Sequence, residues 1–443
     1  MLSTWARKPT LFRGGMKANR RQAQRYINMK QQNNNMDSTR AYKFRIYPDA
    51  KRQSEIDLQL ILSKNLYNKL LERAIEAYLK DKKSKLNMSS LNKILKEVIS
   101  ENQDYLKIYS QTRQNIFIRL QKSYQNFFRR CKEKKSGKKQ NVGFPRFKSR
   151  DRYYSIVYPQ DNGAFSIDKD MLRVSRIGRM KIEQHRQIEG IVKTMTIKRE
   201  AGKYYAIFTA IKDITPPRIK DTNPVGIDMG LKTFAVLSDG MKIPKPNFKK
   251  DAQKGIAKWQ RIVAKKKKGS KNRQKAKLHL QKEYQIATNQ QNDYLHKITN
   301  ELVNSGYTSF AMEKLAIQNM VKNHNLANAI SGASWFKFKE LLSYKAESAG
   351  LKVTEVNARN TSTTCSQCGN TQEMPLSKRT YNCNQCGMKK DRDTNAAINI
   401  LNRAREGHPR RNASGDATST YQRDMRVASM NQEHTQASQE WNP

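Results

Sequence analysis

The spacing of apolar residues in the first half of the chain predicts a β-rich module with a helical insertion. The stretch AYKFRIYP alternates apolar with basic side chains, which is typical of a half-buried strand with a cationic outer face. Residues 52–135 carry apolar side chains at helical spacing, which indicates packed helices with lysine-rich outer faces. The period returns to two over 152–213, where AGK is expected to form a hairpin turn. We therefore predict a β-rich module over residues 41–51 and 136–220, interrupted at 52–135.

Three acidic residues in the second half stand on elements with an apolar, inward-facing pattern. Asp228 lies between two glycines in the predicted strand VGIDMG, and Glu313 ends the short predicted strand FAME. Asp393 begins a predicted helix, where it shares an inward-facing stripe with four apolar residues, Ala396, Ala397, Ile400 and Leu401. Asp391 falls outside this stripe.

An acid on a buried face is costly unless it is paired with protons or cations. Asp228, Glu313 and Asp393, on separate elements, therefore predict one shared metal site. Two divalent ions held by carboxylates are the usual apparatus for cleaving phosphodiester bonds. The alternative is three unrelated acids, each satisfied by a nearby lysine, and the residues alone leave both interpretations open.

The charge of the chain indicates a polyanionic partner. Its 443 residues suffice for more than one domain, and 86 Lys and Arg against 38 Asp and Glu give a formal net charge of +48. Such a charge repels itself unless a polyanion neutralises it, which favours nucleic acid. A ribosomal or general packing protein is the alternative on charge alone.

The remaining composition bears on location. No apolar run approaches the roughly 18 residues of a membrane span, so we expect a soluble protein without a membrane partner. Residues 1–40 are basic and are expected to be disordered, with organelle targeting as an alternative. The true start is Met1 or one of three later methionines, Met16, Met29 and Met36. Residues 406–443 lack periodicity and predict a disordered tail.

Four of the five cysteines form two matched pairs, Cys365-x₂-Cys368 and Cys383-x₂-Cys386. A glycine follows each pair, as tight knuckle turns favour, and the spacing predicts a four-thiolate zinc ribbon rather than a redox pair. The clustering also argues against a disulfide framework and for a reducing compartment. Cys131 stands alone and is expected to be inert.

These residues carry a resemblance to a known family. GIDMGLKTFAVLSDG, FAMEKLAIQNM and NTSTTCSQCG…CNQCG…DRDTNAAINIL resemble the TnpB family, the OrfB proteins of IS200/IS605 and IS607 transposons, which are relatives of compact type V CRISPR effectors. The likeness spans Ala41 to Ala404. It implies a multidomain α/β and α+β protein, in which a β-rich wedge module with a helical recognition insertion precedes an RNase H-like (RuvC) nuclease domain.

The same resemblance assigns boundaries and roles. The nuclease would cover 221–364 with a cationic helical insertion at 251–302, followed by the zinc ribbon at 365–390 and a final helix at 391–405. The catalytic residues and Mg²⁺ or Mn²⁺ ligands that it implies are Asp228, Glu313 and Asp393. The structural zinc ligands that it implies are Cys365, Cys368, Cys383 and Cys386. The ribbon would staple the last helix or, through Lys378, Arg379, Lys389 and Lys390, contact the substrate strand.

The resemblance implies a cytoplasmic, nucleoid-associated prokaryotic protein. The function that it implies is RNA-guided cleavage of double-stranded DNA next to a short flanking motif. The guide RNA would derive from the transposon end, and one protein copy would bind it. The six histidines form no His-x-His pair, so the chemistry of the partner transposase of these elements is not expected. A compact type V CRISPR effector and a non-cleaving, RNA-guided DNA-binding repressor are the alternatives.

Overall fold

The computed structural model describes residues 36–80, 88–137, 141–161, 163–214, 221–375 and 377–406. The predicted tail apart from Glu406, and residues 1–35 of the predicted N-terminal extension, lie outside these residues. Residues 36–40 of that extension, which were expected to be disordered, instead belong to the first strand. The chain forms two compact units. The first comprises Met1–Arg218, Pro246–Asn300 and Glu347–Gly350, and the second comprises Ile219–Lys245, Glu301–Ala346 and Leu351–Pro443.

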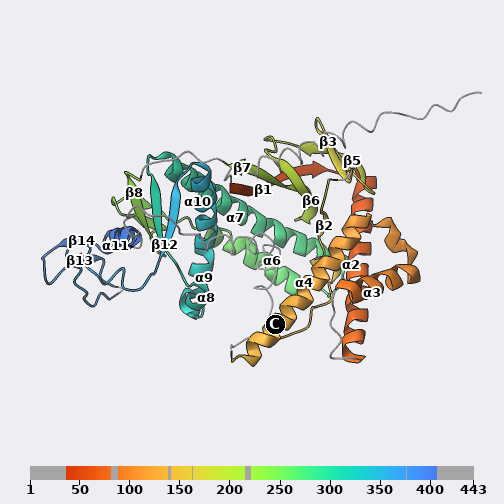
Figure 1. The fold of residues 1–443 in the computed structure, drawn as a ribbon, viewed down its shortest axis with the longest axis horizontal. Helices are drawn as coiled ribbons and strands as arrows, with labels where there is room; N and C mark the ends of the chain where they lie inside the picture. Colours follow the sequence, from red (N-terminus) through yellow and green to blue (C-terminus); the bar gives the residue numbers. More distant parts are fainter. Residues whose placement is uncertain are drawn as a thin grey trace, which may run out of the picture. The chain divides into compact units, whose positions relative to one another are not determined.

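A seven-stranded antiparallel sheet in the order β2-β6-β7-β1-β5-β4-β3 lies in the first unit (Figure 1). Its strands are β1 (Met36–Tyr47), β2 (Ser155–Tyr158), β3 (Phe165–Asp168), β4 (Met171–Val174), β5 (Gly178–Glu183), β6 (Ile191–Glu200) and β7 (Lys203–Ile214). The alternation predicted in AYKFRIYP is confirmed, because Phe44 and Ile46 of β1 are fully buried. The predicted AGK turn is confirmed as the β6–β7 connection, where Ala201 and Gly202 have positive φ.

The helical spacing predicted after β1 is also confirmed. The helices are α2 (Ala50–Lys80), α3 (Met88–Glu101), α4 (Ser110–Lys135) and the short 3₁₀ helices η1 (Gln103–Lys107) and η2 (Arg150–Arg152). Leu66 and Leu70 of α2 and Leu120 and Tyr124 of α4 are buried, so the predicted stripes face the interior. These side chains and the apolar residues of the sheet form one hydrophobic core.

A cationic helical hairpin also belongs to the first unit, although it interrupts the second unit in sequence. It consists of α5 (Phe248–Asp251), α6 (Gln253–Lys265) and α7 (Lys271–Asn304), whose last residues enter the second unit. The rings of Trp259 on α6 and His279 on α7 stack with centroids 4.3 Å apart. Lys277 Nζ lies 2.8 Å from Asp151 Oδ2 of η2, which ties the hairpin to the rest of the unit.

The second unit holds a five-stranded sheet in the order β10-β9-β8-β11-β12 (Figure 1). Its strands are β8 (Pro224–Met229), β9 (Ala235–Leu237), β10 (Lys242–Ile243), β11 (Ser309–Glu313) and β12 (Lys352–Val356). The predicted strand around Asp228 is confirmed as β8, which pairs antiparallel with β9. β11 is parallel to both β8 and β12 and lies between them.

Four helices and a two-stranded ribbon complete this part of the chain. The helices are α8 (Ile317–Met320), α9 (His324–Ala333), α10 (Trp335–Ser348), which crosses into the first unit, and α11 (Arg392–Glu406). The ribbon strands β13 (Thr380–Asn382) and β14 (Lys389–Asp391) pair antiparallel directly before α11. Among the described residues, no helix has the length and apolarity that crossing a membrane requires.

Candidate active site and metal centre

Parallel pairing brings Asp228 and Glu313 together at the C-terminal ends of β8 and β11. Ile227 of β8 and Met312 of β11 are direct partners, and each acid is the next residue along its strand. Because side chains alternate between the faces of a sheet, both acids lie on one face, the one that also carries Gly226.

Gly226 allows the last helix to lie directly on this face. A Cβ atom at Gly226 would stand 2.0 Å from the backbone oxygen of Ala397 and 3.0 Å from Cβ of Leu401, so α11 packs where only a hydrogen fits. Ala396, Ala397 and Ile400 are fully buried, as the predicted stripe requires. The N-terminal turn of α11 carries Asp393, one turn before Ala397.

The three acids interact electrostatically. Burial, followed by the negative charges of Glu313 and Asp393, raises the pKa of Asp228 from 3.8 to about 8. Burial also raises the pKa of Glu313, although a hydrogen bond from the Thr361 hydroxyl opposes the shift. Without cations, the raised pKa values favour protonation of Asp228 and Glu313. Bound cations would neutralise the negative charge of the carboxylates instead.

Within the described residues, Asp228, Glu313 and Asp393 are not gathered into a compact set of metal ligands. Among the described residues, the four cysteines are the only group of three or more His, Cys, Asp or Glu whose ligand atoms all lie within 4.8 Å of one another. A site for two ions about 3.5–4 Å apart needs a wider set of carboxylates.

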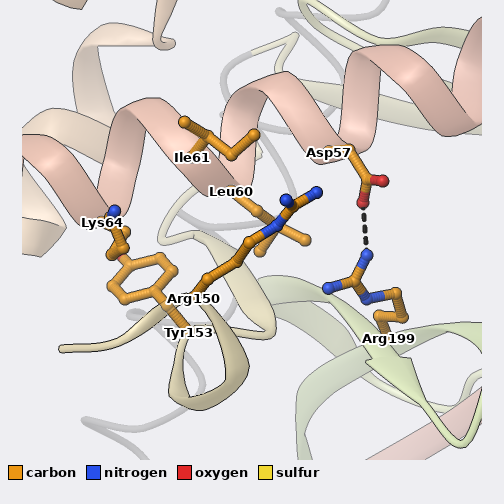
Figure 2. Close-up of a pocket in the computed structure, with 7 residues that line it drawn as sticks. All are labelled: Asp57, Leu60, Ile61, Lys64, Arg150, Tyr153 and Arg199. Carbon is orange, nitrogen blue, oxygen red and sulfur yellow. Dashed lines mark hydrogen bonds and ion pairs between the residues drawn. The ribbon is translucent and has the colours of Figure 1, made fainter. Parts of the chain in front are cut away.

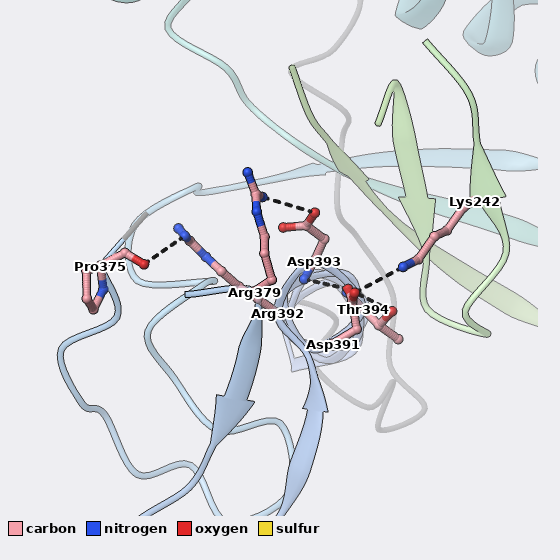
Figure 3. A network of polar contacts seen from close by, with 7 residues as sticks. All are labelled: Lys242, Pro375, Arg379, Asp391, Arg392, Asp393 and Thr394. Atoms are coloured by element: carbon pink, nitrogen blue, oxygen red, sulfur yellow. Dashed lines mark hydrogen bonds and ion pairs between the residues drawn. The ribbon is translucent and has the colours of Figure 1, made fainter. Parts of the chain in front are cut away.

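Asp391 and Asp393 occupy different environments (Figure 3). Asp391 Oδ1 accepts the backbone N–H groups of Asp393 (3.0 Å) and Thr394 (3.1 Å), so Asp391 caps α11. Its Oδ2 lies 3.0 Å from Nζ of Lys242 on β10. Burial raises the pKa of Asp391, but the hydrogen bonds from Lys242 and from the helix outweigh it and lower that pKa overall. Asp393 Oδ2 instead lies 3.7 Å from the Arg379 guanidinium of the ribbon (Figure 3).

Sequence reasoning missed two partners of these acids. Lys242 pairs with Asp391 across 149 residues, and the Thr361 hydroxyl donates to Glu313 Oε1. Thr361 is 2% exposed, which is unusual for a polar side chain in a connecting segment. In the sequence, Thr361 can be noticed only because it lies between the strand β12 and the first cysteine pair. No nearby residue indicates that its hydroxyl contacts Glu313.

The four cysteines form one compact cluster. The Sγ atoms of Cys365 and Cys386 are 3.7 Å apart, and those of Cys368 and Cys383 are 3.5 Å apart. A tetrahedral zinc ion with Zn–S bonds of about 2.3 Å separates its sulfurs by about 3.8 Å, so the cluster fits that ion. Gly369 and Gly387 have φ of 78° and 70°, as the predicted knuckle turns require. Cys131 belongs to α4 and is not part of this cluster.

The first unit has a small cationic pocket that sequence reasoning did not identify (Figure 2). Its lining residues come from α2, from the segment around η2 and from β6, and they are Asp57, Leu60, Ile61, Lys64, Arg150, Tyr153 and Arg199. Asp57 and Arg199 form an ion pair of 2.6 Å, which leaves two further cations beside an aromatic ring. Lys64 and Arg150 contribute positive charge that suits contact with a phosphate, whereas the Tyr153 side chain is buried.

Comparison with known proteins agrees with these features. Family models match three segments of the chain: a helix-turn-helix domain at residues 36–83, the probable transposase OrfB of IS605 at 199–324, and a Cas12f1-like TNB domain at 335–400. In the described part of the first segment, the chain forms one strand and one helix, β1 and α2. The third segment contains the cysteine cluster and most of α11.

Two relatives match along most of their length. A candidate RNA-guided DNA endonuclease of Streptomyces pristinaespiralis is 30% identical over 82% of this chain and 88% of its own. InsQ of Escherichia coli (strain K12), also a candidate RNA-guided DNA endonuclease, is 28% identical over 83% of this chain and 92% of its own. The fold is similar to that of Cas12f1 in a complex with sgRNA and target DNA, with a TM-score of 0.51 and 15% identity over 83% of this chain and 99% of that one. The extent of the match to the Streptomyces protein shows that this chain belongs to the TnpB (OrfB) family of the IS605 group.

Proposed function

We propose that this protein is an RNA-guided DNA endonuclease with a RuvC-like, metal-dependent site at Asp228, Glu313 and Asp393. The observation that carries the proposal is the pKa of Asp228, which burial and then the negative charges of Glu313 and Asp393 raise to about 8. A purely structural site gains no stability from buried carboxylates that lie close together. A cation site requires such carboxylates, because their oxygens are its ligands. The names of the two relatives, both candidate RNA-guided DNA endonucleases, support the same reaction.

The residues of the site would divide the work. Asp228, Glu313 and Asp393 would hold two Mg²⁺ or Mn²⁺ ions, which supply an activated water and stabilise the leaving oxygen when bound. Asp391 would not be a cation ligand, because its carboxylate pairs with Lys242 and caps the helix. Arg379 lies close enough to Asp393 to offset part of its charge while cations are absent.

The guide would be RNA and the target double-stranded DNA. The net charge of +48 supports a polyanionic partner, and the solved neighbour Cas12f1 was determined with sgRNA and target DNA. The helical hairpin α6–α7 and the cationic pocket (Figure 2) provide basic surfaces for such contacts. Base pairing would supply the specificity, while the first unit reads a short flanking motif.

Further proposals concern the guide and the ribbon. The guide RNA would derive from the end of the transposon, and one protein copy would bind it. The four cysteines would hold a structural zinc ion, which fixes β13 and β14 directly before α11. The ribbon would thereby hold the helix that carries Asp393.

Sequencing the RNA that copurifies with the protein tests this proposal. The gene is expressed together with its native flanking DNA, and bound RNA is extracted from the purified complex. We expect one major RNA whose 3′ part extends past the transposon boundary. An RNA with the repeats of a CRISPR array would favour the type V effector instead, and the absence of a specific RNA would overturn the proposal.

A further inference from the structure

The segment 357–366 connects the candidate nuclease site to the cysteine cluster within a few residues. It begins directly after Val356 of β12, which pairs with Glu313 of β11. It ends at the first cysteine pair, immediately after Cys365. Its conformation therefore affects both the acid at one end and the cluster at the other.

Three polar side chains on one stripe of α11 hold this segment. Asn395, Asn399 and Arg403 are spaced four residues apart and so project from the same side of the helix. Arg403 Nη1 donates to the carbonyl of Asn357 at 2.8 Å. Asn399 is 7% exposed and Asn395 is fully buried, so neither amide is a solvent-exposed helix residue.

The two asparagines bind the backbone of the segment at Thr361, Thr364 and Ser366. Asn399 Nδ2 donates to the carbonyls of Thr361 (2.9 Å) and Thr364 (2.7 Å). Asn395 Nδ2 also donates to the carbonyl of Thr364 (2.8 Å), and its Oδ1 accepts the N–H of Ser366 (2.9 Å). Buried amides that use both their donor and acceptor groups hold a backbone in one position.

This fixed backbone aims the Thr361 hydroxyl at Glu313. Thr361 is almost fully buried, and its Oγ1 donates to Glu313 Oε1. A weaker contact of the same hydroxyl to the carbonyl of Ala358, at 3.3 Å, does not compete with a carboxylate acceptor. A contiguous path of hydrogen bonds thus runs from Ser366, beside Cys365, to the carboxylate.

We propose that Thr361 is a positioning residue that orients Glu313 for cation binding, and that Asn395 and Asn399 make this orientation depend on the metal-bound state of the cysteine cluster. The inference rests on the proposed function, because it assigns Glu313 to a cation site. Partners of a ligating carboxylate that fix its orientation commonly change metal affinity or activity by about 10–100-fold when they are removed. The zinc ribbon would then support two of the acids, Asp393 through α11 and Glu313 through Thr361.

A pair of substitutions at Thr361 separates orientation from packing. Thr361→Val keeps the volume and removes the hydroxyl, whereas Thr361→Ser keeps the hydroxyl and removes a methyl group. Thr363→Val is the matched control, because it is the same change two residues along, where the hydroxyl contacts the carbonyl of Asn360 at 3.3 Å and no carboxylate. All variants are prepared as complexes with the copurifying RNA.

Mn²⁺ binding is measured by electron paramagnetic resonance, beside guided DNA binding and the Mg²⁺ dependence of cleavage. We expect Thr361→Val to weaken Mn²⁺ binding at least about 10-fold, with DNA binding unchanged, and we expect Thr361→Ser and Thr363→Val to match the wild type. Wild-type Mn²⁺ affinity in Thr361→Val would overturn the role of Thr361. A loss in Thr361→Ser equal to that in Thr361→Val would show a packing role and overturn it as well.

Zinc removal tests the second part of the inference. Chelation of the cysteine-bound metal should weaken Mn²⁺ binding in the wild type and have little further effect in Thr361→Val, because both changes interrupt one path. Independent, additive losses would overturn the coupling. A wild type that fails to cleave guided targets would instead overturn the proposed function itself, so the two failures are distinguishable.

Discussion

Asp391 Oδ1 accepts the backbone N–H of Asp393 at 3.0 Å, so two acids of the same turn have opposite orientations. Asp391 points toward the helix end and Lys242, while Asp393 points toward Arg379 (Figure 3). Both negative charges raise the pKa of Asp228, and Asp393 does so more strongly than Asp391. The pair therefore offers a sharp comparison of a cap with a candidate metal ligand.

Asp393→Ala is expected to abolish cleavage and to leave RNA-guided DNA binding nearly intact, because it removes a candidate cation ligand and little surface. Asp391→Asn should retain substantial cleavage, since asparagine is also a good N-cap. Asp391→Ala should lose about 0.5–2 kcal/mol of stability through the missing cap and still cleave. Cleavage kinetics and DNA binding at one Mg²⁺ concentration compare the variants, and an inactive Asp391→Asn beside an active Asp393→Ala would refute the assignment.

Asp228 makes the stability of the cation-free protein depend on pH. Its pKa of about 8 in the fold lies above 3.8, so the folded state binds more protons than the unfolded state between these values. Stability should therefore fall as the pH rises from about 4 to about 8. Asp228→Asn removes this loss and should stabilise the cation-free protein at pH 8 by about 2–5 kcal/mol, with a much smaller effect near pH 4.

Thermal or denaturant unfolding in the presence of a magnesium chelator measures this effect at both pH values. Asp293→Asn is the control, because Asp293 pairs with Lys297 on the exposed surface of α7 and should change stability by less than about 0.5 kcal/mol. Adding Mg²⁺ should stabilise the wild type and not Asp228→Asn. An Asp228→Asn variant that is less stable than the wild type at pH 8 contradicts the interpretation of the carboxylate cluster.

The cysteine cluster should contain one zinc ion per chain. Cys383→Ser is expected to lose the metal and to destabilise the second unit, because four thiolates share one ion. Cys131→Ser is the matched control and should keep the zinc, since Cys131 belongs to α4 and is not one of the four clustered cysteines. Elemental analysis of purified wild type that finds no stoichiometric zinc would rule out the ribbon as a zinc site.

The pocket between α2 and η2 should contact phosphates of the bound RNA (Figure 2). Replacing Lys64 and Arg150 together by alanine should weaken RNA binding and reduce the slope of log affinity against log salt concentration by about 2. Lys107→Ala, which removes an exposed cation paired with Asp104, is the control. Unchanged slopes in the double variant would show that the pocket makes no phosphate contact.

The sequence predicted the local features of this protein well. The alternation around Phe44 and Ile46 identifies β1 because side chains on a strand alternate between buried and exposed faces. The stripe of Ala396, Ala397 and Ile400 identifies the buried face of α11 for the corresponding helical reason. The paired cysteines could be identified because two C-x₂-C pairs, each followed by glycine, are typical of a four-thiolate zinc site.

Contacts between distant residues could not be predicted in this way. The hydroxyl of Thr361 contacts Glu313 across 48 residues, and Arg199 pairs with Asp57 across 142. Both depend on which strands and helices become neighbours, and neither leaves a periodic pattern in the sequence. The cap formed by Asp391 is local, but an acid directly before a helix predicts a cap and a catalytic residue equally well.

Guided cleavage of a plasmid library tests the central claim most directly. Purified wild type is incubated with Mg²⁺ and a plasmid that carries the complement of the guide beside randomised flanking bases, with and without the copurifying RNA. An RNA of equal length and unrelated sequence is the control for charge neutralisation, and Asp228→Asn is the control for contaminating nucleases. The account predicts cleavage only with the copurifying RNA, only at its complement and only beside a shared short motif. Efficient cleavage without RNA, at sites that share no sequence, would contradict it and leave only a general nuclease.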